Sequence, residues 1–195
     1  SDSRITTFAY CEQVDVDAAA CPMVGLLVSV DGPRTDVSDV TSFTYRMADD
    51  SGCTNSGYDD FENCKFRKSD LWYVTNALGQ INEYSARDVY GNLRQSVDSN
   101  GTITDLTYNT RGWLLSRTVR ALASGVSHAD DATLSITYDP AGNVVRTTRP
   151  DGTFLRYTYD GARRLIKITD AEGNYIDYCP NGIGSTECLD TAGNR

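Results

Sequence analysis

A short phrase recurs along this chain at a nearly fixed interval. YDPAGN at 138–143 is followed by YDGARR at 159–164 and LDTAGN at 189–194, and degenerate copies stand at 87–92 and 108–113. Tyr138 and Tyr159 are 21 residues apart, as are Gly91 and Gly112. A fixed period of this length is typical of a repeat architecture, in which each repeat is one small structural unit.

A second turn signal falls about ten residues after each copy, at SNG 99–101, PDG 150–152 and AEG 171–173. Asn-Gly and Asp-Gly favour two-residue hairpin turns. The segments between the signals, such as 144–149, 153–159 and 165–169, are rich in the strand formers Thr, Tyr, Val and Ile. Two strands and two short turns need about 18 to 22 residues. One repeat is therefore predicted to be one β-hairpin.

Alternation along 153–159 predicts which side chains share a face of the sheet. Thr153, Leu155, Tyr157 and Tyr159 fall on one face, and Leu106 and Tyr108 share a face in the equivalent stretch. A stripe of tyrosines across neighbouring hairpins is expected. No stretch shows the sustained 3.6-residue apolar spacing of a helix.

The residues that carry the repeat resemble a known family. YTYD at 157–160, Arg164-Leu165 and DAEG at 170–173 are similar to the YD repeat of bacterial Rhs (rearrangement hot spot) proteins, insecticidal toxin-complex subunits and animal teneurins. DGPRTD at 31–36 and TAGNR at 191–195 are also Rhs-like. The resemblance is clearest over 76–195. Arg163 departs from it, because most copies have Gly at that position.

These observations predict an all-β fold of antiparallel β-hairpin repeats in a curved or spiralling open sheet. The expected regions are a cysteine-containing degenerate repeat region at 1–75 and a YD-repeat array at 76–195 with an inserted loop near 121–131. The predicted motif residues set turn geometry and strand register. They are Tyr108, Gly112, Tyr138, Asp139, Gly142, Gly152, Tyr157, Tyr159, Asp160 and Gly173.

The resemblance implies a structural shell segment that encloses a C-terminal toxin or effector. Its partners would be flanking repeats of the same polypeptide and that cargo. The chain starts with Ser1 and stops directly after a turn motif, so we expect a piece of a longer protein. The alternative is a cell-surface adhesion module that binds carbohydrate through Trp72, Tyr73, Trp113 and the tyrosine stripe. Aromatic pairs that hold strand register explain the same residues without a ligand.

The six cysteines fall into three close pairs: Cys11 with Cys21, Cys53 with Cys64, and Cys179 with Cys188. Six cysteines permit fifteen connectivities, and the short separations favour one bridge within each pair. The lack of Cys-x-x-Cys and the single histidine argue against zinc. Disulfides would indicate a secreted or cell-surface protein.

Charge and hydropathy argue against two further classes of partner, nucleic acid and the membrane interior. A net charge of −9 argues against nucleic acid, because phosphate binding needs a basic surface. An acidic, solubilising surface explains the charge. The sequence contains no signal peptide and no apolar run long enough to predict a membrane span.

The sequence offers little for catalysis or cofactor binding. His128 lies in the predicted insertion without a nucleophile motif beside it, and Ser185 does not satisfy Gly-x-Ser-x-Gly. No phosphate-binding glycine motif is present, so no cofactor and no enzyme activity are expected. Asp139 and Asp160 are explained by bonds from their carboxylates to local backbone N–H groups in turns.

Acidic pairs raise calcium as a possible ligand, because hard oxygen atoms suit that ion. The pairs are Asp15 with Asp17, Asp49 with Asp50, and Asp59 with Asp60. None belongs to an Asp-x-Asp-x-Asp-Gly loop, so solvated turn aspartates are the favoured interpretation and no metal site is predicted.

Overall fold

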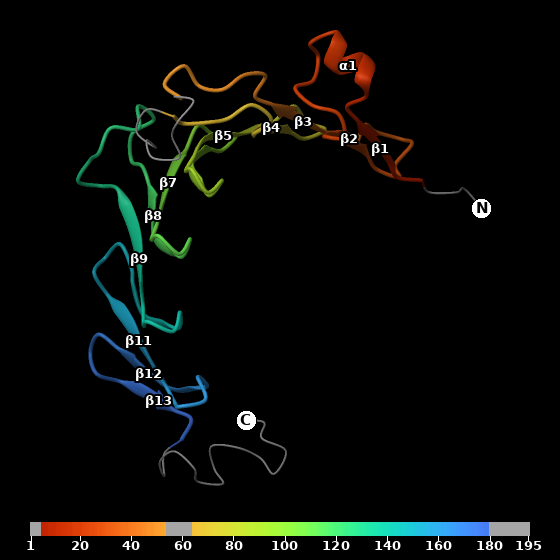
Figure 1. Cartoon of the computed structure of the whole chain (residues 1–195). Coiled ribbons are helices and arrows are strands. Elements are labelled where there is room, and N and C mark those ends of the chain that lie inside the picture. Colours follow the sequence, from red (N-terminus) through yellow and green to blue (C-terminus); the bar gives the residue numbers. More distant parts are fainter. Residues whose placement is uncertain (1–4, 54–63, 180–195) are drawn as a thin grey trace. The chain divides into compact units, whose positions relative to one another are not determined.

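The computed structural model describes residues 5–53 and 64–179. Their thirteen strands form one open antiparallel sheet in which strand order follows sequence order (Figure 1). This confirms the all-β hairpin prediction, although a short helix, α1, is present at Gln13–Asp17. The strands are β1 Thr7–Tyr10, β2 Leu27–Asp31, β3 Thr41–Tyr45, β4 Leu71–Thr75, β5 Ile81–Arg87, β6 Leu93–Val97, β7 Ile103–Tyr108, β8 Leu114–Val119, β9 Ala132–Tyr138, β10 Val144–Thr148, β11 Phe154–Tyr159, β12 Leu165–Asp170 and β13 Tyr175–Asp177.

The described chain packs as two units. Of the described residues, one unit comprises 5–53, 64–106 and 120–128, and the other comprises 107–119 and 129–179. In the first unit, β1 to β4 come from the part of the chain where the repeat is weakest, and α1 lies between β1 and β2. Strand pairing therefore extends well beyond the recognisable copies of the phrase.

Very little of this sheet is buried. Among the described residues, the buried apolar side chains are Cys11, Cys21, Pro22, Ala86 and Cys179, and Asp160 is the buried charged one. A single layer has no second layer to cover either face, so most of its apolar side chains stay half exposed. The strand ladder and the turns must therefore contribute much of the stability.

Eight connections between strands share one five-residue hydrogen-bond pattern. The N–H of the first residue donates to the carbonyl of the fifth, and the N–H of the fourth donates to the carbonyl of the first. The turns are 76–80, 88–92, 98–102, 109–113, 139–143, 149–153, 160–164 and 170–174. The fourth residue has a positive φ in every one, which is the three-residue hairpin loop with a left-handed final residue.

The prediction of two-residue turns is therefore wrong. The residue before the glycine, such as Asn100 or Asp151, does not take the positive φ that a type I′ turn needs at both central positions. The sequence signal marked the correct places, but Gly101 and Gly152 act as the last residue of a longer loop. Arg163 takes the same position with φ 63°, a conformation that costs about 1–2 kcal/mol in a residue with a Cβ.

The register of β11 shows which of its predicted residues share a face of the sheet. The β11–β12 ladder shifts between Thr158 and Tyr159, and β11 begins at Phe154, so Thr153 belongs to the preceding turn. Within the strand, Leu155 and Tyr157 are half buried whereas Arg156 and Thr158 are exposed. The two sides of this strand therefore differ in burial.

The connection between β8 and β9 spans 120–131 and packs beside β7. The backbone N–H of Arg120 donates to the carbonyl of Ile103 over 2.9 Å, and its guanidinium pairs with Asp105. A Cβ on Gly125 would lie 3.3 Å from the Ile103 side chain. This connection is thus held against the strand by both polar and apolar contacts.

Candidate functional site

The recurring structural site is the turn that opens with Asp or Asn. We call the seven turns at 76–80, 88–92, 98–102, 109–113, 139–143, 160–164 and 170–174 the Asx turns. In each, the Oδ1 of the first residue accepts the backbone N–H groups of the third and the fifth residue. For Asp139 both distances are 2.9 Å. One short side chain thereby satisfies two donors that the loop would otherwise leave open.

The second carboxylate oxygen is matched to the fifth residue of the turn. Asn143 donates its side-chain amide to Asp139 Oδ2 at 2.8 Å, and Asn92 and Asn174 do the same in their turns. In the turn that opens at Asp160, Arg164 takes this place and donates Nε at 2.6 Å. That turn therefore replaces both the usual glycine and the usual asparagine by arginine while keeping the same hydrogen bonds.

These bonds hold the carboxylates in their ionised form. The Asn143 side-chain amide, followed by the Asn143 backbone N–H, holds the pKa of Asp139 below its usual range. For Asp160 the largest cause of its lowered pKa is the Arg164 backbone N–H. The pKa values of Asp98 and Asp170 are also lowered by hydrogen bonds from the fifth residue of their turns.

The tyrosine that precedes a turn binds backwards across a strand pair. Tyr159 ends β11 and donates its hydroxyl to the carbonyl of Val144, the first residue of β10, at 2.8 Å. Tyr138 ends β9 and donates to Leu114, the first residue of β8, at 3.0 Å. Tyr45 repeats this contact with Leu27 at 2.7 Å. Burial raises the pKa of Tyr159, so the hydroxyl stays protonated and able to donate.

Tyr138 and Tyr159 each reach the residue that follows an earlier turn. Val144 comes directly after the 139–143 turn, and Leu114 comes directly after the 109–113 turn. We call the Tyr138 and Tyr159 contacts the tyrosine latches. A Tyr-Asp dipeptide therefore does two jobs: the tyrosine fastens the strand to the base of the previous turn, and the aspartate closes the next one. This explains why the two residue types stand side by side.

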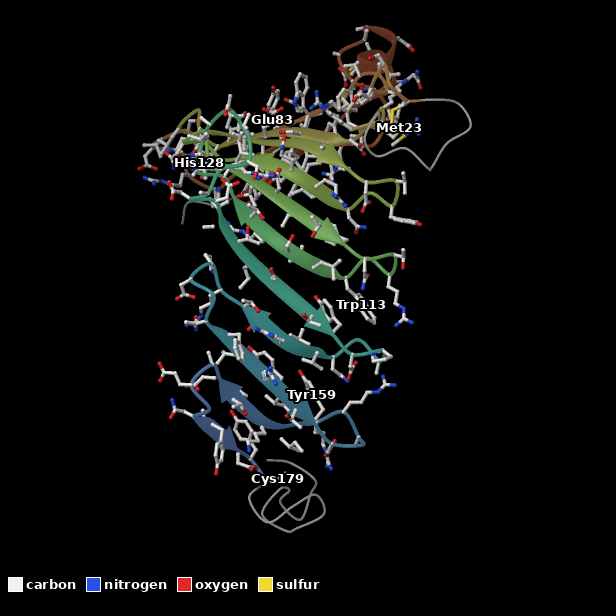
Figure 2. The ribbon with its side chains drawn as sticks, turned by 90° about the vertical axis from the view of Figure 1, so that its left-hand side faces the viewer. Met23, Glu83, Trp113, His128, Tyr159 and Cys179 are labelled. Atoms are coloured by element: carbon white, nitrogen blue, oxygen red, sulfur yellow. A yellow bond between two sulfur atoms is a disulfide. The ribbon has the colours of Figure 1, made fainter. Side chains whose placement is uncertain are left out.

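Trp113 joins two neighbouring turns in the second unit (Figure 2). Its ring lies 5.2 Å from that of Tyr138, and Arg111 donates to the carbonyl of Pro140 at 2.8 Å. A Cβ on Gly142 would lie 2.8 Å from the Trp113 ring. Gly142 is thus required by close packing as well as by its positive φ of 93°.

A second cluster surrounds Arg46 in the first unit. Its guanidinium carbon lies 3.9 Å from the ring centroid of Phe66 and 3.9 Å from that of Trp72. Trp72 also donates Nε1 to Glu83 at 3.0 Å, and Glu83 lies 3.8 Å from Arg46 Nη2. Desolvation lowers the pKa of Arg46 although Glu83 opposes the shift. The Arg46 cation thus contacts two aromatic rings.

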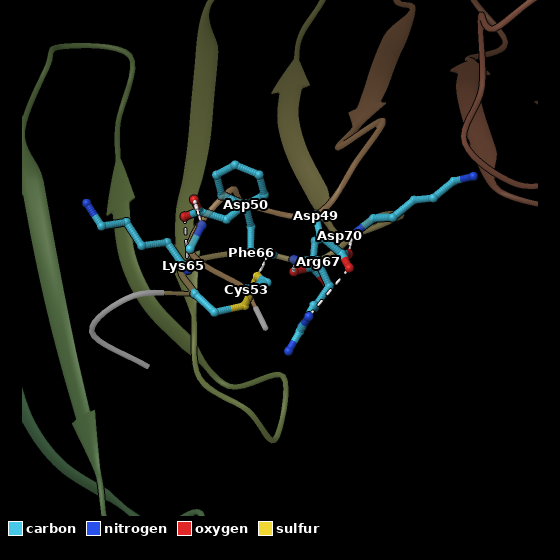
Figure 3. The surroundings of a disulfide bond; sticks show 10 residues. Asp49, Asp50, Cys53, Lys65, Phe66, Arg67 and Asp70 are labelled. Carbon is cyan, nitrogen blue, oxygen red and sulfur yellow. Dashed lines mark hydrogen bonds and ion pairs between the residues drawn. A yellow bond between two sulfur atoms is a disulfide. The ribbon is translucent and has the colours of Figure 1, made fainter. Parts of the chain in front are cut away.

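The Cys53–Cys64 disulfide lies beside this cluster (Figure 3). Cys53 Sγ is 3.4 Å from the carbonyl oxygen of Phe66. Asp50 accepts the backbone N–H groups of Gly52 and Lys65, and Asp49 accepts that of Lys68. These contacts hold the segment that carries Phe66 over Arg46. A cavity of about 170 Å³ adjoins it, lined by Cys64, Phe66, Arg67, Asp70, Arg87, Asp88, Val89 and Gly91.

Two of the three predicted cysteine pairs form disulfides among the described residues. Cys11 and Cys21 form a disulfide with their Cα atoms 6.0 Å apart, and those of Cys53 and Cys64 are 4.5 Å apart. Cys179 is buried. Its predicted partner, Cys188, lies outside the described residues.

The described residues that the sequence raised as candidates for catalysis or metal binding do not come together in one site. His128 is exposed in the connection between β8 and β9. Asp15 and Asp17 accept bonds from Glu12 and Gln13 within their own helical turn. Over 5–53 and 64–179, no three metal-ligating side chains come together. Ser185, Asp59 and Asp60 lie outside the described residues.

Trp72, Tyr73 and Trp113 pack against other side chains of the protein. Trp72 stacks on Tyr73 with centroids 4.2 Å apart and covers Arg46, and Trp113 packs between turns. This favours aromatic pairing that holds the fold over a platform for stacking sugars. Sequence reasoning missed the Arg46 cluster, because only tertiary structure brings Arg46, Phe66 and Glu83 together.

In the described part of the chain, no helix is both long and apolar enough to span a bilayer. That finding concerns helices alone.

Comparison with known proteins gives one family match and several distant structures. Residues 138–175 match the RHS Repeat family, and no curated protein matches the chain. A structure of the Photorhabdus luminescens Tc holotoxin pore is 13% identical with a TM-score of 0.31 and covers 88% of this chain and 14% of its own. The crystal structure of TcdB2-TccC3 is 15% identical with a TM-score of 0.39 and covers 84% and 10%. Because these values are low, the structures carry no argument beyond this likeness, and the family match is confined to residues 138–175.

Proposed function

Because the chain carries an RHS repeat at residues 138–175, we propose that it is a non-enzymatic structural segment of an Rhs shell that encloses a C-terminal toxin or effector. The chain spans only 10–14% of the similar solved chains, so cargo and shell belong to the proposal. Flanking repeats of the same polypeptide would continue the sheet on either side.

The tyrosine latches carry this proposal. Each repeat closes its own turn with Asp and fastens itself to the previous turn with Tyr. Such a unit adds to its neighbour in the same way at every step, so a wall can extend without a buried core. The structural role thus follows from contacts that repeat rather than from one special site.

The two disulfides support a secreted protein, because such bonds persist in oxidising compartments. The role of the sheet is mechanical under this proposal: paired strands hold the cargo away from its surroundings until delivery. Removal of the imidazole in His128→Ala should therefore leave cargo enclosure unchanged.

Limited proteolysis of the full-length protein tests enclosure. The fate of the C-terminal segment is followed by mass spectrometry in the natural protein, in a Tyr138→Phe, Tyr159→Phe double variant that loses both latches, and in a Thr158→Ala control. We expect protection in the natural protein and the control, and earlier cleavage in the double variant. Rapid cleavage of the C-terminal segment in the natural protein would contradict enclosure, and equal protection in all three proteins would contradict the role of the latches.

A further inference from the structure

In the second unit, the strand register separates two kinds of side chain. Directly opposite residues of an antiparallel pair share a face. Ser116 faces Ser135, Thr118 faces Thr133, Thr137 faces Arg146, and Arg156 faces Thr169. Hydrogen bonds between the hydroxyls of Thr107 and Ser116 and between those of Thr118 and Thr133 lie along this face. We call it the hydroxyl face. The other face carries Leu134, Ile136, Leu155, Tyr157 and Ile168.

Two arginines meet directly on the hydroxyl face. Arg146 of β10 is the register partner of Arg156 of β11. Their guanidinium carbons lie 4.0 and 5.2 Å from the ring centroid of Phe154. Like charges directly opposite each other destabilise a strand pair, and the ring offsets part of that cost.

Within the described residues, no carboxylate pairs with Arg146 or Arg156 to offset the remaining repulsion between them. Neither arginine has a salt bridge there, and Arg146 Nε is buried without a hydrogen-bond acceptor. The neighbouring positions on this face are Thr137, Thr148 and Thr169, and Lys167 adds a third cation opposite Thr158. Asp177 lies on this face opposite Lys167, whereas Asp170 faces Leu155 on the other side.

We propose that Arg146 and Arg156 bind a side-chain carboxylate of an acidic polypeptide segment laid across the hydroxyl face. Guanidinium groups bind carboxylates through paired hydrogen bonds. The flanking threonines can donate to and accept from a peptide backbone. The proposal goes beyond the shell function, because it does not require the bound segment to be cargo.

Two features select this occupant. Arg156 is exposed on an open strand surface, which suits an extended chain better than a small molecule that needs a concave pocket. The net charge of −9 disfavours a long polyanion such as nucleic acid, because long-range repulsion acts on every phosphate. A short segment with one or two carboxylates meets mainly the local positive charge.

Fluorescence anisotropy of a labelled Glu-Thr repeat peptide against the full chain tests the site, with a Gln-Thr peptide as the uncharged probe. Arg156→Gln removes one guanidinium at an exposed position. Arg117→Gln is the matched control, because Arg117 is exposed on the opposite face. We expect Arg156→Gln to weaken Glu-Thr binding by roughly tenfold and Arg117→Gln to leave it unchanged, and both variants should still unfold cooperatively on heating.

Equal binding of the two peptides would overturn the proposal, as would the same loss in Arg117→Gln, since that result would indicate general attraction. Absence of binding to the natural chain at low salt would overturn it too. A sulfated oligosaccharide that binds through Arg156 while the Glu-Thr peptide does not would show that the occupant is wrong.

Discussion

At the scale of single residues, the Tyr-Asp pair combines two functions that are usually separate. Tyr159 makes a contact across strands, whereas Asp160 makes contacts only within its own turn. The aspartate contacts span two and four residues and therefore form wherever the turn forms. The tyrosine contact depends on the register of the neighbouring strand.

Tyr159→Phe should lower the free energy of unfolding by about 1 kcal/mol, because it removes one hydrogen bond and keeps the ring. Tyr175→Phe is the control. The recorded contact of Tyr175 is its ring against Lys167, which phenylalanine preserves. Urea titration of both variants measures the difference, and an equal effect of the two changes would contradict the latch.

Gly142→Ala should cost more stability than Gly152→Ala. Both residues have a positive φ, so both variants carry the same kind of backbone strain. A Cβ at position 142 would also press on the Trp113 ring, whereas one at 152 meets nothing within 4 Å. Thermal unfolding of the two variants compares them, and similar Tm values would show that the ring moves aside freely.

Arg163→Gly should stabilise the protein by roughly 0.5–1 kcal/mol, because it relieves a left-handed residue while adding some chain entropy to the unfolded state. Arg163→Ala keeps a Cβ and should give no comparable gain. Urea titration distinguishes the two. A gain in both variants would point to the arginine side chain rather than to its backbone.

At the scale of elements, the segment between β3 and β4 is fastened to the sheet by side chains. Cys53 Sγ contacts the Phe66 carbonyl oxygen, and the Arg46 guanidinium contacts the Phe66 ring. The Phe66 and Trp72 rings shield part of the Arg46 guanidinium from water. This element owes its position to side chains, whereas the hairpins owe theirs to backbone bonds.

A Cys53→Ser, Cys64→Ser double variant should lose roughly 2–3 kcal/mol of stability, as expected for a crosslink that closes a short loop. It should also shift Trp72 fluorescence, measured in a Trp113→Phe background, because Phe66 is no longer held over Arg46. The matched control is Cys11→Ser, Cys21→Ser, which should reduce stability without that shift. Unchanged Trp72 fluorescence in the Cys53→Ser, Cys64→Ser variant would show that the disulfide is not needed to hold Phe66 over Arg46.

At the scale of the whole molecule, one turn chemistry is repeated along a chain that buries few apolar side chains. The free energy of folding is therefore the sum of many small and similar turn contributions, whereas a globular domain relies on a buried core. Four of the Asx turns open with an aspartate whose pKa is lowered, Asp98, Asp139, Asp160 and Asp170, so the contributions of these four turns should respond to pH together.

Stability should fall in acid. Asp98, Asp139, Asp160 and Asp170 have folded-state pKa values below the usual range, so the folded state binds fewer protons than the unfolded state near those pKa values. Their contribution is present above about pH 4, the ordinary aspartate pKa, and is lost as the pH falls through the lowered values. Thermal unfolding from pH 7 to pH 2 should show a nearly constant Tm that drops in the acid range. Asp160→Asn should flatten that drop, and an identical profile would contradict the assignment.

Local features of the sequence were enough to predict the turns and the strands. The 21-residue period marked the hairpins, and Asp139 and Asp160 could be assigned to turns because their hydrogen bonds join residues close in sequence. The loop length was mistaken because Asn-Gly and Asp-Gly occur both in two-residue turns and at the end of three-residue loops. The Arg46 cluster had no sequence signal, because Arg46 and Glu83 are far apart in the chain.

The sequence by itself determined that this protein is an all-β hairpin array with recurring turns, two of them closed by Asp139 and Asp160, since strand propensity and turn hydrogen bonds act over a few residues. Only the tertiary structure decided which strands share a register. That register places Tyr159 against Val144, sets Arg146 opposite Arg156, and brings Phe66 over Arg46. A shift by one residue would move each strand's side chains to the other face, so these contacts depend on pairings that no local pattern encodes.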